Sequence, residues 1–321
     1  MSSYFDLSIP VDSADILRGD ELARVRELIT SAFRLGYTCV ALDYRARLPL
    51  RPSDACRLQC AALSMGAIIP SIVNEATISM AAAAPRVLMS KRDATRLSRK
   101  RQRDSGGGGG GGGGGVGIGD VLVKTTKNKN NNVAPRVLSR ITIALESATD
   151  GGRFAAARIS AALSSPSPIL LGWDIIAVEA ADAAGLEAAA GLVDIVTIDM
   201  SAARLPFPIS VSLATAVLEK GAIFELRYAP AIRDIGARRF LIAGARALLM
   251  ATRGRGVTLA SGGKSALELR MPRDAAAIAS LFGLSLQAAI IALSSASASV
   301  IAHAKKRKNG GVEVISESEQ I

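Results

Sequence analysis

Histidine is almost absent from this sequence of 321 residues, in which His303 is the single example. A metal centre that uses several imidazole ligands therefore cannot form. Any Ser-His-Asp or Cys-His catalytic arrangement would have to use this one side chain. The scarcity of histidine thus excludes whole classes of metalloenzyme before any motif is considered.

Cysteine and aromatic residues are also scarce. Three cysteines form an odd, small set that argues against a disulfide scaffold and for a reducing compartment. Cys56 and Cys60 lie four residues apart, but no second Cys or His pair could complete a zinc site, so we expect structural thiols. Aromatic residues make up 4% of the chain, and Trp173, Tyr228 and Phe282 lie in apolar strings, which favours core positions over base stacking.

The net charge of +11 is distributed unevenly along the chain. Residues 90–133 contain ten Lys and Arg against three Asp, a net of +7, while the tail from Lys305 carries +1 and the remainder only +3. This composition is typical of a nuclear-import signal or a non-specific nucleic-acid contact, and the alternative is a solvated linker. The candidates for import or RNA contact are Lys91, Arg92, Arg99, Lys100, Arg101 and Arg103.

The same segment contains a ten-glycine run, Gly106–Gly115, and an asparagine run, Asn130–Asn132. Such a stretch cannot offset the entropy of ordering itself, so we expect residues 90–133 to be a disordered surface insertion. The glycine run lacks both the Lys-Ser/Thr ending of a phosphate loop and an apolar strand before it. The sequence therefore predicts one domain over residues 1–303, interrupted at 90–133 and followed by a flexible charged tail, 304–321.

The C-terminal region needs to be weighed as a membrane span. Residues 275–304 contain no Asp, Glu, Lys or Arg, and four basic residues follow at once, as in a span with a positive flank. Against this, Gly283 is placed as a helix stop and Ser285 as a new N-cap, and the stretch is rich in Ala and Ser. We therefore favour two buried helices and no membrane contact; the first ten residues contain no secretory signal.

Apolar strands alternate with helices through the rest of the chain, which indicates a parallel sheet with helices outside it. A first helix, capped by Asp20, is expected to end at Gly36, and a second to span residues 53–65. The expected strands are residues 4–11, 38–42, 67–73, 140–145, 175–178, 195–198, 209–211, 223–228 and 257–260. No Gly-x-Gly-x-x-Gly follows the first strand, and about 250 residues fit a (β/α)₈ barrel, so we predict a TIM-barrel-like α/β fold.

Several strings resemble a known family. The N-terminal ones are Tyr4-Phe5-Asp6-Leu7-Ser8-Ile9-Pro10, Gly36-Tyr37, Val40-Ala41-Leu42 and Arg140-Ile141-Thr142-Ile143. The later ones are Trp173-Asp174-Ile175-Ile176, Val193-Asp194-Ile195-Val196, Arg204-Leu205-Pro206-Phe207, Phe224-Glu225-Leu226, Tyr228, Pro230-Ala231-Ile232-Arg233-Asp234, Arg238-Arg239, Leu267-Glu268-Leu269-Arg270 and Leu281-Phe282-Gly283. In this order they resemble the thirty-kilodalton protein subunit of ribonuclease P and ribonuclease MRP, with departures at Met271 and Arg273, where the family usually has a glycine and an aromatic residue.

The resemblance implies a barrel-like fold and a place in a ribonucleoprotein of the nucleus, and within it the nucleolus. It implies a non-catalytic, RNA-binding role in removing 5′ leaders from precursor tRNA, and in ribosomal-RNA processing in the MRP particle. The RNA subunit, with its magnesium ions, would be the catalyst, so no cofactor is expected on the protein. The implied partners are ribonuclease P or MRP RNA and the other protein subunits, notably the small ferredoxin-like one, with precursor tRNA contacted indirectly.

Two alternatives remain open. A metal-dependent phosphoesterase could use carboxylates near strand ends, namely Asp6, Asp12, Asp43, Asp199 and Glu225, but the single histidine disfavours it. A subunit that binds only protein neighbours is the second alternative.

RNA contact is expected to be mostly electrostatic. The ordered candidates are Arg233, Arg238, Arg239, Arg253, Arg255, Lys264 and Arg270. Arg233 is expected at the C-terminal end of a barrel strand, where functional loops gather, although it could instead pair with Asp234. Arg253 and Lys264 flank the last strand on opposite sides, so these candidates cannot all share one face, and Glu225 could be the partner of another arginine.

Overall fold

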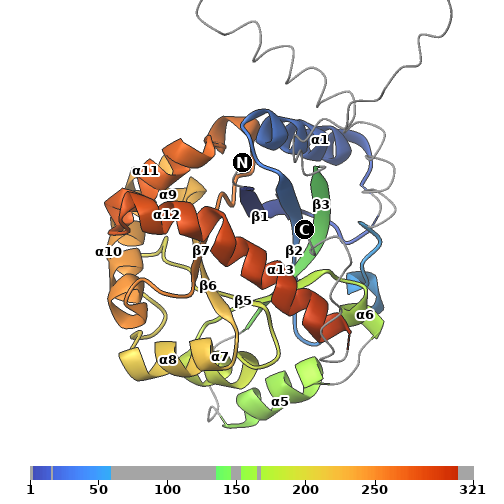
Figure 1. Ribbon diagram of the computed structural model, residues 1–321. Coiled ribbons are helices and arrows are strands. Elements are labelled where there is room, and N and C mark those ends of the chain that lie inside the picture. The colour runs from blue at the N-terminus through green and yellow to red at the C-terminus, as the bar shows by residue number, and fades with distance from the viewer. Residues whose placement is uncertain (1–2, 16, 59–134, 146–152, 165–167, 310–321) are drawn as a thin grey trace, which may run out of the picture. The chain divides into compact units, whose positions relative to one another are not determined.

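The computed structural model describes residues 3–15, 17–58, 135–145, 153–164 and 168–309. Seven parallel strands form a single sheet in sequence order from β1 to β7. They are β1 (Phe5–Val11), β2 (Cys39–Arg47), β3 (Arg136–Ala144), β4 (Ile175–Glu179), β5 (Ile195–Thr197), β6 (Ile223–Arg227) and β7 (Val257–Ala260) (Figure 1). The candidates for import within 90–133, the strand expected at 67–73 and most of the helix expected at 53–65 lie outside the described residues.

The sheet curves until β7 returns to β1. Gly262, just after β7, donates its backbone N–H to the Ser8 carbonyl of β1 at 3.0 Å. Ser261 donates its N–H to the Asp6 carboxylate at 2.9 Å. Within the described residues, β7 and β1 are not paired as neighbouring strands of the sheet, so these contacts are what closes the barrel. The predicted TIM-barrel-like α/β fold is confirmed.

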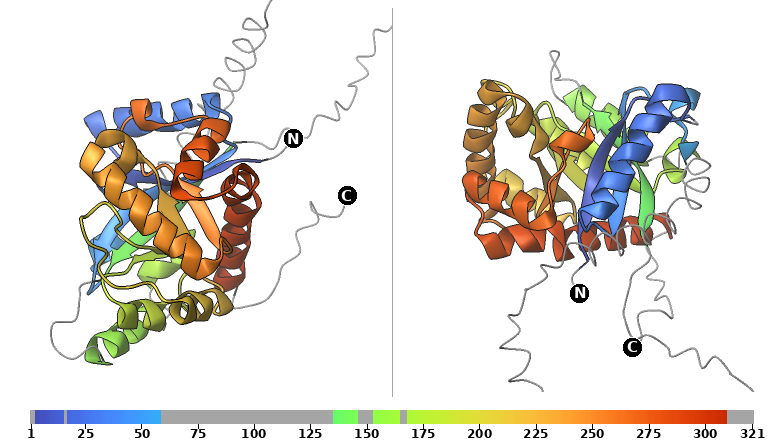
Figure 2. Two further views of the ribbon diagram at one scale, coloured as in Figure 1. Left: turned by 90° about the vertical axis from the view of Figure 1, so that its left-hand side faces the viewer. Right: turned by 90° about the horizontal axis from the view of Figure 1, so that it is seen from above.

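Helices follow the strands and cover the outside of the sheet (Figures 1 and 2). They are α1 (Gly19–Arg34), α5 (Arg153–Ser164), α6 (Pro168–Leu171), α7 (Ala183–Ala189), α8 (Val211–Glu219), α9 (Ala229–Arg233), α10 (Ile235–Thr252) and α11 (Pro272–Phe282), with short 3₁₀ turns η1 (Pro52–Asp54) and η2 (Ala266–Glu268). Asp182, Ser210 and Asp234 are N-caps whose side chains accept from the third backbone N–H.

Two local predictions were wrong. The strand expected at 209–211 is instead the start of α8, because Ser210 caps a helix there. Asp20 does not cap α1, which begins one residue earlier after Arg18, so its carboxylate lies in the first turn, where it favours the positive end of the helix dipole.

The last two helices, α12 (Leu286–Leu293) and α13 (Ser295–Lys308), follow the predicted stop and cap. Gly283 has φ +107°, and the Ser285 side chain accepts from Ala288. Together the two helices are long and apolar enough to cross a membrane by length and composition, and 33% of the most apolar window is buried. In the described structure, α13 lies under the N-terminal ends of the strands (Figure 2, right).

A small second core explains the position of α13. Val300, Ile301 and Ala304 pack against the barrel floor, which is formed by Leu7, Cys39, Ala41, Ile175, Ala177 and Ile195. Polar contacts hold the helix in register: the Thr258 and Ser297 hydroxyls are 2.7 Å apart, and Asp194 binds both His303 and Arg307. The helix therefore closes the N-terminal end of the barrel as a plug.

Candidate functional site

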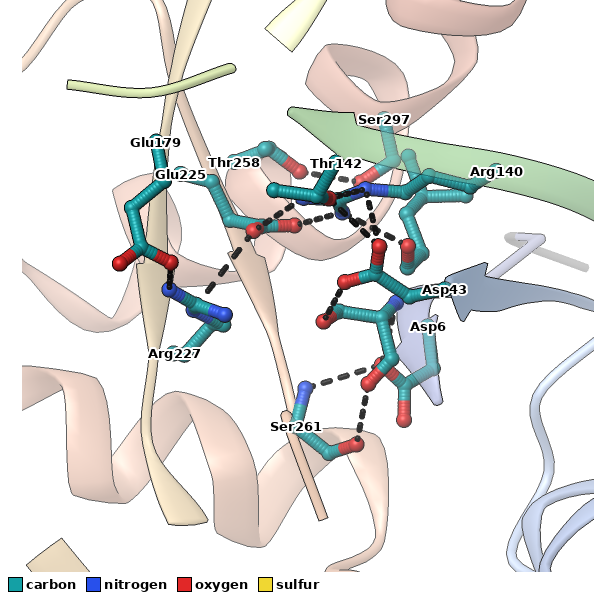
Figure 3. Close-up of polar contacts among 12 residues, drawn as sticks. Asp6, Asp43, Arg140, Thr142, Glu179, Glu225, Arg227, Thr258, Ser261 and Ser297 are labelled. Carbon is teal, nitrogen blue, oxygen red and sulfur yellow. Dashed lines mark hydrogen bonds and ion pairs between the residues drawn. The ribbon is translucent and has the colours of Figure 1, made fainter. Parts of the chain in front are cut away.

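A buried arginine occupies the centre of the barrel. Arg140, on β3, is 0% exposed, and its guanidinium forms a two-pronged ion pair with Glu225 on β6, with Nη2 2.8 Å from Oε2 (Figure 3). Nη1 also donates to the Leu7 carbonyl at 2.8 Å, and Nε donates to Thr142 Oγ1 at 3.1 Å. The arginine thus connects β1, β3 and β6 across the barrel.

Asp43, on β2, completes this network. Its carboxylate accepts hydrogen bonds from the hydroxyls of Ser8 (2.9 Å) and Thr142, and lies 3.4 Å from Arg140 Nε. Burial by itself would lower the pKa of Arg140, but the charges of Asp43 and Glu225 outweigh it and raise that pKa above its ordinary value. Asp43 and Glu225 thus share one buried cation, and Arg227 Nε lies a further 4.0 Å from Glu225 Oε2.

The carboxylates at the barrel centre are already engaged by a cation of the protein itself. Asp43 and Glu225 already bind a guanidinium, and no group of three or more His, Cys, Asp or Glu side chains in the described residues could hold a metal ion. His303 lies at the opposite end, where its Nδ1 is 2.8 Å from Asp194 Oδ1. The metal-dependent phosphoesterase alternative therefore has neither clustered ligands nor an available histidine in this part of the chain.

Above the network, a cavity of about 400 Å³ opens at the C-terminal end of the strands. Its charges nearly balance. The carboxylates are Asp12, Asp43, Glu179, Asp199 and Glu225, and the cations are Arg45, Arg227, Arg233 and Lys264. Glu179 pairs with both Arg45 (2.6 Å) and Arg227 (3.3 Å). The usual position of a barrel active site thus holds neighbouring charges of both signs.

A second polar network lies where β7 meets β1. The Tyr37 hydroxyl donates to the Arg270 carbonyl, and the Arg270 N–H donates to the Tyr228 hydroxyl, both at 3.1 Å. Tyr37 and Tyr228 are buried, and burial raises the pKa of both phenols. Asp6 is fully buried beside them, and its Oδ2 has no hydrogen-bond partner in the described structure. This seam holds the barrel closed through side chains from distant parts of the sequence.

The Asp6 carboxyl predicts a specific pH dependence. Burial raises its pKa from 3.8 to about 6, so the folded protein binds this proton more tightly than the unfolded chain does, and ionisation costs stability. The free energy of unfolding should therefore fall between pH 4 and pH 6. In Asp6→Asn this contribution is absent, and the difference between variant and wild type should grow over that range by up to about 3 kcal/mol. Urea unfolding at half-unit pH steps measures it, and a pH-independent difference would contradict the prediction.

The structure separates the seven ordered RNA-binding candidates. Arg233 and Lys264 lie at the C-terminal cavity, as expected for Arg233. The possible pairing of Arg233 with Asp234 is wrong, because Asp234 caps α10 and Arg233 binds Glu268, with Nη2 2.8 Å from Oε2. That pairing lowers the pKa of Glu268 and raises that of Arg233.

Two further candidates are held by backbone carbonyls. Arg238 donates from Nε to the Ala231 carbonyl at 2.6 Å, and Arg270 donates from Nη1 to the carbonyls of Leu267 and Leu269. Arg239 is exposed. Arg253 and Arg255 line a separate cavity of about 640 Å³ near the start of β6 and β7, at the opposite end from Lys264. The candidates thus do not form one site.

The structure agrees with two expectations: that three aromatic residues are core residues, and that Glu225 pairs with an arginine. Trp173, Tyr228 and Phe282 are buried, so these three are core residues. Glu225 does face an arginine, Arg140. Sequence reasoning missed Arg140 itself and the contacts of Asp194 with α13. A charged residue inside an apolar strand, for Arg140, or directly before one, for Asp194, was a usable signal.

Comparison with known proteins identifies the family. Residues 120–309, more than half of the chain, match the family model described as RNase P subunit p30. This chain belongs to the RNase P subunit p30 family. The matched range contains β3 to β7, both partners of the central ion pair, and α13. Of the family strings noted in the sequence, those that begin at Arg140 and at Phe224 supply the two partners of the central ion pair.

The aligned share of the chain differs from one relative to the next. It is 27% identical over 321 residues to Protein GAMETOPHYTE DEFECTIVE 1 of Arabidopsis thaliana, covering 97% of this chain and 46% of that protein. It is 38% identical over 116 residues to Ribonuclease P protein subunit p30 of Mus musculus, covering 36% and 43%. The chain spans about half the length of the curated relatives it matches. Among solved structures, a chain of archaeal Ribonuclease P with mature tRNA matches with a TM-score of 0.47 and 12% identity, over 98% of this chain and 100% of that one.

Proposed function

We propose that this protein is a non-catalytic subunit of ribonuclease P, in which the RNA with its bound magnesium ions cleaves the 5′ leader of precursor tRNA. The observation that carries the proposal is Arg140, which fills the barrel centre and pairs with both Asp43 and Glu225. A family member with this centre supplies no nucleophile or metal ligand there. Its contribution is to bind and stabilise RNA and to contact other subunits.

RNA binding in this proposal is electrostatic. The proposal includes a nuclear and nucleolar location and a second role in the MRP particle, in ribosomal-RNA processing. The buried aromatics leave phosphates and 2′-hydroxyls as the groups to be bound. The basic residues of 90–133 would add affinity or nuclear import. Support comes from the family match and the net charge of +11.

Sequencing the RNA that co-purifies with the tagged full chain tests this proposal. We expect ribonuclease P RNA, and MRP RNA as well if the protein serves both particles. RNA-free protein should show no metal-dependent cleavage of precursor tRNA. Absence of both RNAs, or cleavage at ordinary turnover by the RNA-free protein, would refute the assignment.

The protein-only scaffold differs in one measurable respect. Exposed apolar residues near the C-terminal cavity, Ile235 (71% exposed) and Leu267 (86%), are suited to a protein neighbour such as the small ferredoxin-like subunit. They flank the Arg233–Glu268 ion pair in the sequence. Ultraviolet crosslinking within the purified particle separates the two roles: an RNA-binding subunit crosslinks to RNA, whereas a scaffold is incorporated without such crosslinks.

A further inference from the structure

The outer face of the plug helix α13 has no acidic residue, and its exposed side chains are small up to the basic last turn. Val300, Ile301 and Ala304 face the barrel, while Ala298, Ser299 and Ala302 are exposed on the other side. The helix contains no Asp or Glu, and its last turn contributes Lys305 and Lys306, both exposed. A polyanion could therefore approach this end of the barrel closely without meeting a carboxylate on the helix.

The acidic residues beneath the helix are already neutralised. Asp194 is fully buried and accepts from Arg307 at 3.0 Å and from the Ile176 N–H at 2.9 Å, in addition to its contact with His303. Asp174 binds Lys308 at 2.7 Å; burial is the largest single influence and would raise the pKa of Asp174, but the interactions with Lys308 and Ser139 together outweigh it and lower that pKa. Two of the four basic residues at the end of α13 thus fix the helix to the barrel, and two remain available.

Other available cations lie at the same end. Arg253 and Arg255 line the cavity that also includes Gly221, and the Gly221 backbone lies against the His303 ring: a Cβ built there would be 3.0 Å from Nε2. The cavity is thus adjacent to α13. Within the described part of the chain, the exposed side chains of Arg253, Arg255, Lys305 and Lys306 make no hydrogen bond or ion pair, and Glu219 is the one carboxylate that lines the cavity.

The two ends of the barrel therefore differ in charge. At the C-terminal end, carboxylates and cations nearly balance, and most of the cations are paired. Among the described residues at the N-terminal end, cations exceed available carboxylates. A phosphate backbone binds most favourably where cations are exposed and unpaired, because each contact releases counterions without first breaking an ion pair.

We propose that the N-terminal end of the barrel, formed by α13 and the Arg253–Arg255 corner, is the surface that binds the RNA phosphate backbone. The inference rests on the proposed function and specifies its interface. It reverses the expectation drawn from Arg233 and the usual location of barrel active sites, since the C-terminal end is the charge-balanced one. The ligand chemistry is the phosphodiester backbone of RNA, read without base specificity.

The test compares two charge-matched triple variants of the full chain, so that residues 90–133 contribute equally to each. The first, Arg255→Gln/Lys305→Gln/Lys306→Gln, removes three cations from the N-terminal end. Arg253 is kept because it ends α10 in the left-handed conformation, with φ +53°, so the variant leaves this helix end unchanged. The second, Arg204→Gln/Arg239→Gln/Lys264→Gln, removes three exposed cations from loops and helix turns that follow the C-terminal ends of β5, β6 and β7.

The probe is a fluorescent 20-nucleotide oligouridylate, whose Kd is measured from about 50 to 300 mM salt. The first variant should weaken binding by on the order of 10- to 100-fold at physiological salt and lower the slope of log K against log salt by about 2, since each single-strand contact contributes about 0.7. The second should change Kd less than about threefold, with the slope retained. Circular dichroism and thermal unfolding confirm that both variants are folded.

Equal losses in both variants, or a larger loss in the second, would overturn the assignment of the surface while leaving RNA binding itself intact. Wild-type protein that fails to bind the oligouridylate and co-purifies with no RNA would overturn both the surface and the proposed function.

Discussion

Replacing Arg140 with methionine should lower the free energy of unfolding by about 3–5 kcal/mol, because it leaves Glu225 and Asp43 charged and without their cation inside the barrel. Both carboxylates are nearly inaccessible to water, at 2% and 6% exposure. Methionine fills similar volume, so the expected loss reflects the missing charge rather than a cavity. Urea unfolding of the full chain, monitored by the fluorescence of buried Trp173, measures it.

Arg233→Met is the matched control. Arg233 also forms a two-pronged pair with a glutamate, Glu268, but its side chain is 38% exposed. A pair screened by water contributes about 0–1 kcal/mol, so this variant should be near wild type in stability. Adding Glu225→Gln to Arg140→Met should recover at least about 1 kcal/mol by removing the uncompensated charge. A small loss for Arg140→Met would contradict the central role assigned to the ion pair.

The strands and the helix ends near Gly283 were predictable because their signals are local. Apolar runs such as residues 195–197 reflect burial on both faces of a strand, and Gly283 with Ser285 ends one helix and begins the next within three residues. The ordered family strings likewise predicted the barrel. Composition and periodicity alone do not distinguish an open parallel sheet from a closed barrel.

The central ion pair was not predictable from local signals, because its partners are 85 residues apart. An arginine at position 140 and a glutamate at position 225 each begin or interrupt an apolar run, which indicates a buried charge but does not name its partner. Their meeting depends on the barrel closing with β3 and β6 on facing sides. Asp6 and Tyr228 are likewise far apart in the sequence. Their strings resemble the family, but only the closed barrel brings them together in the seam.

The sequence predicted that α13 is buried against the domain, but not where it packs. The break at Gly283 and Ser285 and the many Ala and Ser residues favoured buried helices over a membrane span. Which end of the barrel α13 covers is set by Asp194 and Asp174, each more than 100 residues away in the sequence. The same contacts determine which basic residues are left exposed. Net charge alone could not separate Lys305 and Lys306 from the structural Arg307 and Lys308.

The plug itself predicts a large, position-specific effect. Val300→Asp should destabilise the fold by several kcal/mol or prevent folding, because Val300 is 0% exposed against the barrel floor and an isolated carboxylate there has no partner. Ala302→Asp, two residues away and exposed, should change stability by no more than about 0.5 kcal/mol. Thermal unfolding of both variants in buffer without detergent makes the comparison. A membrane-spanning helix would show a different pattern, since Asp at either position would cost about 2.5–3.5 kcal/mol of insertion, and the wild type would need detergent to remain in solution. Strong loss at Val300 with tolerance at Ala302 therefore supports a helix that closes the barrel with one face and leaves the other exposed to water.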